Sequence, residues 1–302
     1  MDQPPAPVPF ETVACPVCGD AMNVRVIRDD GPRGRVVRCR RRDLGLVSPR
    51  PVSTIGLYED PAYFGQAGGN SEAGYLAYDE DSNVMSAYFA GVAHDLAERV
   101  GRGRLLEVGC ANGSFLRAAR AASFEVQGVE PGDSAAQVAR AGGLDVLTGT
   151  LDDPRIGEGA WDAVVLTQTV EHLPDPASAL VRLLALLRPG GVLLMTTPNQ
   201  HSWLARLSGK RWFEYKPPEH LFLFTPRTIA ALLARAGFEE IEVTRDVHRY
   251  PPRWVLRRLG RYVPPARPLV AIAERLLPGA LLDMTLPVYY GSMRVTARRP
   301  QS

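Results

Sequence analysis

The chain has 302 residues, of which 45% are hydrophobic and 23% charged, and its formal net charge at pH 7 is +2. This composition is typical of a soluble globular protein with a sizeable core, and it excludes a polyanion binder that works by bulk charge alone. The first residues lack the charged and apolar regions of a signal peptide, and no run of about 18 apolar residues predicts a membrane span. We therefore expect a cytoplasmic protein.

The N-terminal third divides into three segments by composition. Residues 1–10 are rich in proline, which predicts a flexible tail. Residues 11–51 hold a Cys-x-x-Cys turn, a basic hairpin and one further cysteine, and Arg42 stands where the spacing calls for a fourth. Residues 52–100 are aromatic-rich and are expected to form a helical lid. The lid contains Tyr63, Tyr75 and Tyr78. These tyrosines could contact the cofactor or the substrate; the alternative is that they pack in the core.

From residue 101 onward, apolar strands alternate with amphipathic helices. The predicted strands are 104–109, 125–130, 144–149, 161–169, 191–198, 239–246 and 291–299. The predicted helices are 114–123, 133–142, 175–190, in which the closing Pro-Gly stops the helix, and 225–238, the last with Thr225 as its N-cap and a proline in its first turn. This alternation indicates an α/β fold with a parallel sheet covered on both faces, and ligands bind at the carboxyl ends of such strands.

A tight glycine turn, in "LLEVGCANGSF", follows the first of these strands. Gly109 and Gly113 allow a close approach of the backbone to a ligand. Glu130 ends the next strand, where a carboxylate can accept both hydroxyls of a ribose. The alternative is a packing turn beside a surface glutamate.

The same loop differs from a dinucleotide-binding fingerprint. That fingerprint requires G-x-G-x-x-G, but Ala111 and Ser114 occupy its second and third glycine positions. Glu107 precedes the loop and would repel a pyrophosphate, whereas it suits a ligand with an amino group or a sulfonium. We therefore expect no binding of NAD.

Five motifs occur in order between residues 104 and 246: "LLEVGCANGSF", "GVEP", "LTGTLDD", "WDAVVLTQTVEHLPDP" and "LLRPGGVLLMTTPN". Together they resemble class I S-adenosylmethionine-dependent methyltransferases, most closely the small-molecule branch that includes ubiquinone-biosynthesis-type enzymes. The resemblance implies a Rossmann-like, seven-stranded, mostly parallel sheet. It also implies S-adenosylmethionine as cofactor, with the following contacts: Glu107, Gly109 and Gly113 at the methionine end, Glu130 at the ribose, Thr150 and Leu151 at the adenine, and Gln168 beside the transferred methyl. Ala111 departs from the usual glycine, so a slightly displaced loop is expected.

Methyl transfer requires an aligned nucleophile and, where that nucleophile carries a proton, a base. Histidine suits this task near neutral pH. His220, within "YKPPEHLFLFT", is the expected proton acceptor, and Glu219 beside it could orient the imidazole or bind substrate. His172, just past the fourth strand, is the other catalytic candidate. Each histidine could instead be structural, His172 by ordering its loop and His220 within a proline-rich turn.

The cysteine segment resembles the metal-binding ribbon that precedes the methyltransferase domain in some family members. Cys15, Cys18 and Cys39 match three of its ligands, and "GLVSPRP" matches the run that closes it. The resemblance implies a structural zinc ion, with Asp43 as the candidate fourth ligand, although structural zinc sites take four ligands and Cys₃Asp is unusual. The alternative is an eroded ribbon that keeps its shape through hairpin pairing and packing.

Insertions are expected near residues 198–224 and 250–285 of the domain that spans 101–302. Residues 253–267 of the second insertion contain five arginines and no acid. An amphipathic helix of this kind contacts an anionic membrane peripherally or an acidic substrate, or it simply packs on the domain. One helical face can carry the apolar residues Trp254, Val255, Leu259 and Tyr262.

These features favour an enzyme that methylates a small molecule at oxygen or carbon, for example a sugar, a quinone-like compound or a lipid-linked intermediate. The alternatives are an RNA methyltransferase that uses the ribbon to bind RNA, and a non-catalytic cofactor-binding protein. The sequence "TQTVEH" stands where base-amino methylases carry an N-P-P-Y type motif, so RNA is the less favoured partner. No DNA partner is expected.

Overall fold

A seven-stranded sheet forms the centre of the protein. The computed structural model describes residues 9–59, 78–262 and 264–301, so Tyr63, Tyr75 and the side chain of Tyr78 lie outside the described residues. The strand order is β12-β15-β10-β9-β6-β7-β8, and only β15 runs antiparallel to its neighbours. The strands are β6 (Arg104–Val108), β7 (Glu125–Glu130), β8 (Val146–Thr148), β9 (Trp161–Thr167), β10 (Leu187–Pro198), β12 (Glu239–Arg245) and β15 (Ser292–Arg298). The predicted fold class is confirmed.

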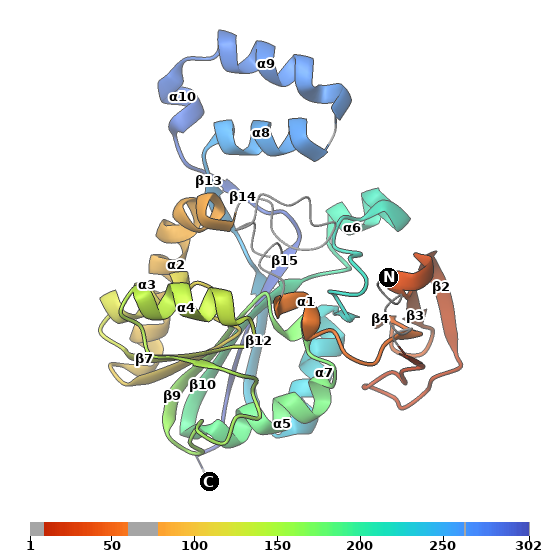
Figure 1. Ribbon diagram of the computed structural model, residues 1–302, viewed down its shortest axis with the longest axis vertical. Coiled ribbons are helices and arrows are strands. Elements are labelled where there is room, and N and C mark those ends of the chain that lie inside the picture. Colours follow the sequence, from red (N-terminus) through yellow and green to blue (C-terminus); the bar gives the residue numbers. More distant parts are fainter. Residues whose placement is uncertain (1–8, 60–77, 263, 302) are drawn as a thin grey trace, which may run out of the picture.

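Helices cover both faces of this sheet (Figure 1). Because successive strand residues point to opposite faces, Val164 and Leu166 of β9 enter one core cluster, while Ala163 and Val165 enter the other. The first cluster includes α5 (Pro176–Leu186) and α7 (Pro226–Ala236). The second includes α2 (Tyr78–Val100), α3 (Ser114–Ala121) and α4 (Asp133–Ala141).

The start of α7 and the end of α5 can be compared with the helix boundaries predicted from the sequence. At the start of α7, the Thr225 hydroxyl accepts a hydrogen bond from the Thr228 amide at 3.1 Å and Pro226 occupies the first turn, so the predicted cap is confirmed. The helix that is expected to run from residue 175 up to the Pro189-Gly190 stop ends earlier. α5 ends at Leu186, because Leu187 already pairs with Trp161 of β9 and the residue before Pro189 is disfavoured in helical conformation.

The N-terminal segment forms a second, smaller sheet beside the main one (Figure 1). It contains β2 (Val24–Asp29), β3 (Arg35–Cys39) and β4 (Gly45–Val47), and its fourth strand is β11 (Phe222–Leu223), which pairs antiparallel with β4. β1 (Phe10–Glu11) pairs with β5 (Arg50–Pro51). The insertion that contains α6 (Trp203–Ser208) and β11 is thereby joined to the cysteine segment by backbone hydrogen bonds.

The second insertion projects from one end of the molecule. β13 (His248–Tyr250) and β14 (Leu286–Val288) form an antiparallel stalk. The stalk carries α8 (Pro252–Tyr262), α9 (Arg267–Leu276) and α10 (Gly279–Asp283), which lie beyond the sheet and its covering helices (Figure 1). Among the residues that the structure describes, no helix combines the length and the hydropathy that a membrane crossing requires.

Candidate active site

A cavity of about 390 Å³ lies at the carboxyl ends of β6, β7 and β9. On the side of the sheet, the cavity is lined by Gly109, Glu130 and Gln168. The facing wall comes from residues 50–55 and from Tyr58 of α1 (Gly56–Glu59). Its size is in the range of small-molecule sites. Two distant parts of the chain therefore build one cavity, at the sheet edge where the fold places ligands.

Glu130 connects two loops at this edge. Its carboxylate accepts the amide hydrogen of Ala111 at 2.9 Å and that of Gly132 at 2.8 Å. Burial raises the pKa of Glu130, and these two hydrogen bonds oppose the rise. Each carboxylate oxygen keeps a further lone pair, so both can still accept a ligand hydroxyl. This is compatible with the predicted ribose contact.

Glu107 is a buried carboxyl group with one unsatisfied oxygen. Its side chain is 1% exposed, and Oε1 accepts the Thr167 hydroxyl at 2.9 Å, whereas Oε2 has no hydrogen-bond partner among the described residues. Burial raises its pKa to about 8, and the Glu130 carboxylate contributes to the rise. A cationic ligand group would satisfy this oxygen and favour the ionised form. Glu107 itself is not among the residues that line the cavity, so its contact with an amino group or a sulfonium stays a prediction.

The two loop glycines have different tasks. Gly109 lines the cavity at φ 73°, and a Cβ there would come within 2.7 Å of the Thr169 side chain. Gly113 does not line the cavity. It precedes α3 at φ 78°, and its missing Cβ leaves room for Leu144, which would lie 2.3 Å away. Gly113 thus shapes the turn rather than the cavity wall.

Ala111 stands where related loops carry glycine, and it has itself adopted a left-handed conformation at φ 46°. Such a conformation costs an alanine about 1–2 kcal/mol. Its methyl group packs with Ala135 of α4 and against Leu57 and Tyr58 of α1. The alanine therefore keeps the turn and adds an apolar contact to the helix on the opposite wall.

The remaining predicted cofactor residues all line the cavity. Thr150 and Leu151 follow β8, and Gln168 follows β9. Gln168 is held at φ 51°, and it donates hydrogen bonds to Thr196 from its backbone amide (3.0 Å, to the carbonyl) and from its side chain (3.2 Å, to the hydroxyl). A strained residue that its neighbours fix in this way is typical of functional sites. The individual cofactor contacts of these three residues stay predictions.

His172 is the histidine that lines the cavity. It ends a 3₁₀ turn, Val170–His172, just after β9, and its Nδ1 lies 3.0 Å from the Tyr58 hydroxyl. Burial lowers its pKa to about 4, Lys216 adds to this effect, and a hydrogen bond to the Glu219 backbone opposes it. The imidazole is therefore neutral at physiological pH. Sequence reasoning did not single out Tyr58, because a tyrosine in an aromatic segment carries no signal of its own.

His220 contacts His172 but does not itself line the cavity. The two rings meet edge to face with centroids 4.8 Å apart, and Nδ1 of His220 lies 3.0 Å from the Glu214 carbonyl oxygen. Burial lowers the pKa of His220 well below its usual value. Glu219 is also buried away from the cavity. The choice of His220 as proton acceptor stays a prediction, although the residue that lines the cavity is its neighbour His172.

Glu171 completes a buried cluster with these histidines. The Thr197 hydroxyl donates to its Oε2 at 2.9 Å, Oε1 has no partner among the described residues, and burial raises its pKa to about 8. Ligand atoms of Glu171, His172 and His220 lie within 4.8 Å of one another. These are donors that divalent metals bind, although Nδ1 of each histidine already has a hydrogen-bond partner.

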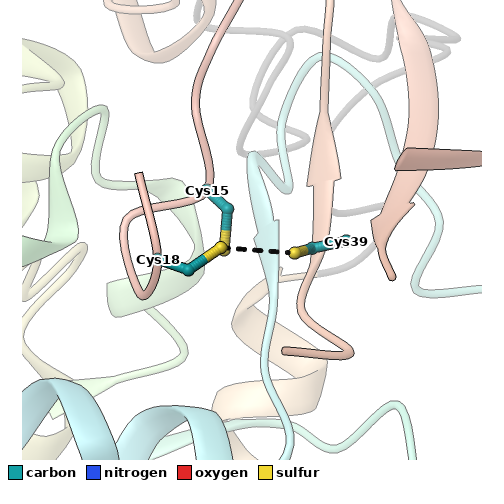
Figure 2. A group of neighbouring side chains, drawn as sticks. All are labelled: Cys15, Cys18 and Cys39. Carbon is teal, nitrogen blue, oxygen red and sulfur yellow. Dashed lines mark hydrogen bonds between the residues drawn. The ribbon is translucent and has the colours of Figure 1, made fainter. Parts of the chain in front are cut away.

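Figure 2 shows that the three predicted cysteine ligands point toward one another. Cys15 and Cys18 lie in the turn before β2, Cys39 ends β3, and the Sγ atoms of Cys18 and Cys39 are 3.6 Å apart. The structure does not bring Asp43 to them. Its carboxylate contacts Nε2 of His201 and, at 3.5 Å, the Arg38 guanidinium.

Comparisons with known proteins agree with this geometry. The family model described as "Methyltransferase domain" matches residues 81–243. A ubiquinone biosynthesis O-methyltransferase of Thiobacillus denitrificans is 28% identical over 154 residues, which cover 47% of this chain and 66% of that protein. Another from Marinobacter nauticus is 29% identical over 176 residues, 53% of this chain and 73% of that protein. The chain thus spans about two thirds of the length of these relatives.

Among solved structures, the crystal structure of a SAM-dependent methyltransferase from Archaeoglobus fulgidus superimposes with a TM-score of 0.51 at 17% identity. The match covers 73% of this chain and 97% of that one. At this level of identity the likeness shows the fold alone. The family model spans residues 81–243 and therefore leaves out the cysteine segment and α1 before it and the helices α8–α10 after it.

Proposed function

Because the chain belongs to the methyltransferase-domain family, whose model matches more than half of it, we propose that it transfers a methyl group from S-adenosylmethionine to a small molecule. The observation that carries this proposal is the pair of buried carboxyl groups at the strand ends, Glu107 with an unsatisfied oxygen and Glu130 with two loop amides. The chain's similarity to two ubiquinone biosynthesis O-methyltransferases supports oxygen as the methylated atom; carbon is the alternative.

The cofactor supplies an electrophilic methyl group, and the protein has to hold it and align the acceptor. Glu107 would bind the cationic end, Glu130 the ribose hydroxyls, and Thr150 and Leu151 the adenine. Gln168, fixed by Thr196, would lie beside the transferred methyl. Residues 50–55 and Tyr58 form the opposite wall and would exclude water from the reacting atoms.

Tyr58 and His172 form the proton-accepting pair in this proposal. Both line the cavity, and neutral Nδ1 of His172 can accept a proton that the Tyr58 hydroxyl passes on from the acceptor. The low pKa keeps His172 in its accepting form at neutral pH. His220 would then position the His172 ring through their edge-to-face contact.

The direct test is calorimetric titration with S-adenosylmethionine, S-adenosylhomocysteine and NAD, followed by a screen of phenolic, sugar and lipid-linked acceptors. We expect binding of the first two ligands and none of NAD. Tight binding of NAD would refute the assignment. Cofactor binding without turnover on any acceptor would favour the non-catalytic alternative.

We further propose that the three cysteines hold a structural zinc ion. Their converging thiols are the donors that zinc prefers. Burial disfavours the Cys18 thiolate, but hydrogen bonds from the Asp20 backbone and from the other two thiols, with the charge of Arg41, lower its pKa below its usual value. Asp43 lies elsewhere, and no fourth His, Cys, Asp or Glu among the described residues joins the three thiols.

A further inference from the structure

The helices α8, α9 and α10 concentrate exposed apolar side chains. Nine of the twenty large hydrophobic side chains that are exposed in the described part of the chain lie between residues 255 and 286. On α9, Leu269, Ile272 and Leu276 share one helical face and are 69%, 52% and 75% exposed. Val270 of the same helix is buried against α8. The exposed stripe is therefore a separate face from the one that holds the three helices together.

The same segment is strongly basic. Residues 248–290 contain seven arginines and two acidic residues, a net charge of +5, although the whole chain carries only +2. Both acidic residues are engaged within the segment: Asp283 pairs with Arg253 at 2.7 Å and Glu274 with Arg257 at 3.1 Å. These pairs tie α10 and α9 to α8. The segment therefore carries more positive charge than its own two acidic residues can balance.

A buried polar network fixes the base of the stalk. Nε2 of His248 in β13 lies 2.8 Å from the Asp246 carboxylate and 3.0 Å from the Tyr290 hydroxyl. The His248 ring also stacks on Tyr88 of α2 with centroids 3.9 Å apart, and the Tyr88 hydroxyl donates to Asp246 at 2.7 Å. Because these groups are buried and satisfy one another, the stalk is rigidly connected to the catalytic domain.

We propose that the α8–α10 tip docks the protein on an anionic lipid bilayer, with the Leu269, Ile272 and Leu276 stripe in the interfacial layer and the arginines among the lipid phosphates. A bilayer supplies both an apolar layer and anionic headgroups, which match the two properties of the tip. A second copy of the chain is disfavoured as occupant, because two tips of charge +5 would repel each other. The proposal does not depend on the identity of the methyl acceptor.

Vesicle co-sedimentation of the full chain tests this docking. We expect binding to vesicles of equal parts phosphatidylglycerol and phosphatidylcholine at least about tenfold tighter than to phosphatidylcholine alone. Raising NaCl from about 0.05 to about 0.5 M should weaken it. The double variant Leu269→Ser/Leu276→Ser should lose at least about tenfold in partitioning, and Arg267→Gln/Arg275→Gln should lose about tenfold on the anionic vesicles only.

The matched control is Val138→Ser/Val181→Ser, which removes exposed apolar side chains from α4 and α5 of the catalytic domain and should leave vesicle binding unchanged. Unchanged S-adenosylmethionine affinity in the tip variants shows that the catalytic domain is intact and separates this test from that of the proposed function. Three results would overturn the proposal: no binding of the wild-type chain to anionic vesicles, equal losses in tip and control variants, or a dimer in light scattering that the leucine variant abolishes.

Discussion

The Tyr58 hydroxyl and Nδ1 of His172 lie 3.0 Å apart, although 114 residues separate them in the chain. Tyr58 comes from α1, in the N-terminal segment that the family model leaves out, whereas His172 follows a strand of the central sheet. The cavity is thus lined both by the family domain and by a segment outside it, and the two meet at this contact. If this pair moves the proton, the catalytic unit of the protein includes both segments.

Removing either member should reduce turnover without loss of the cofactor. Loss of a general base typically costs about 10²–10⁴-fold in rate, so we expect that effect from His172→Ala and a smaller loss from Tyr58→Phe. S-adenosylmethionine affinity should stay within a few-fold in both. His172 accepts a proton only when neutral, and its pKa is about 4. The rate should therefore fall below about pH 5, as His172 becomes protonated, and not near 6.5.

His220→Ala is the decisive comparison for this prediction. If His220 only positions the His172 ring, its removal should cost less turnover than His172→Ala. A larger loss in His220→Ala than in His172→Ala would instead restore His220 as the proton acceptor. Full activity in both variants would indicate an acceptor that needs no base.

Cofactor binding should release a proton at Glu107. Burial raises the Glu107 pKa to about 8, so the free protein carries a protonated carboxyl group at pH 7. A bound cation favours the carboxylate and lowers that pKa, which releases about one proton per site at pH 7. The release should vanish as the pH rises above 8, because the carboxyl group is then already ionised. Calorimetry in buffers of different ionisation enthalpy measures it directly.

Glu107→Gln supplies the control, because glutamine keeps an acceptor for the Thr167 hydroxyl but has no proton to lose. This variant should bind S-adenosylmethionine at least about tenfold more weakly, with no buffer dependence. S-adenosylhomocysteine lacks the sulfonium charge, so the same measurement with it shows whether the amino group alone drives the release. If cofactor binding to the wild-type protein took up a proton, or released none, the assignment would be contradicted.

Glu130→Ala should weaken cofactor binding by about 1.5–3 kcal/mol, the range for a hydrogen bond to a charged group. It also leaves the Ala111 and Gly132 amides without their acceptor, so the loss includes loop disorder. Glu130→Gln retains one carbonyl oxygen and should fall between wild type and alanine. Titration calorimetry of the three proteins gives the order of their cofactor affinities. Equal affinities would contradict a ribose contact.

The sequence predicted the parts of this fold that follow from local patterns. The period of two in the strands placed the central sheet, and the Thr225–Pro226 pair placed the start of α7, because propensity and capping act over a few residues. The end of α5 was missed by a few residues, since pairing of Leu187 in the sheet overrode the helical pattern.

Contacts between distant segments could not be predicted in the same way. β11 has two residues, too few for a periodic signal, yet it joins the insertion to the cysteine segment. The glycine-loop pattern singled out Glu107 and Glu130, and the family resemblance singled out Gln168. Tyr58 and the partners of His248 depend on tertiary packing alone. Asp43 was chosen by its position near Cys39, but its turn directs the carboxylate to His201.

Zinc occupancy can be decided by elemental analysis of the purified chain, for which we expect about one zinc per chain. Cys39→Ser should abolish zinc binding, because it leaves only two of the three converging thiols and structural zinc sites take four ligands. Cys110→Ala is the matched control, since Cys110 is buried between β6 and α3 and lies outside the cluster. Chelation should lower the melting temperature and increase hydrogen exchange in residues 11–51. Equal zinc in the Cys39 and Cys110 variants would exclude this site.

Ala111→Gly should uncouple the glycine loop from α1 with little effect on global stability. Glycine removes a left-handed alanine that costs about 1–2 kcal/mol, but it also raises the entropy of the unfolded chain, by about 0.4–1 kcal/mol. It further loses the methyl contact with Leu57 and Tyr58, worth up to about 0.8 kcal/mol. These terms nearly cancel, so the free energy of unfolding should change by less than about 1 kcal/mol. Hydrogen exchange in residues 52–59 should nevertheless rise and turnover should fall several-fold, because Tyr58 loses part of its support. A variant with wild-type turnover and exchange would show that the methyl group does not position Tyr58.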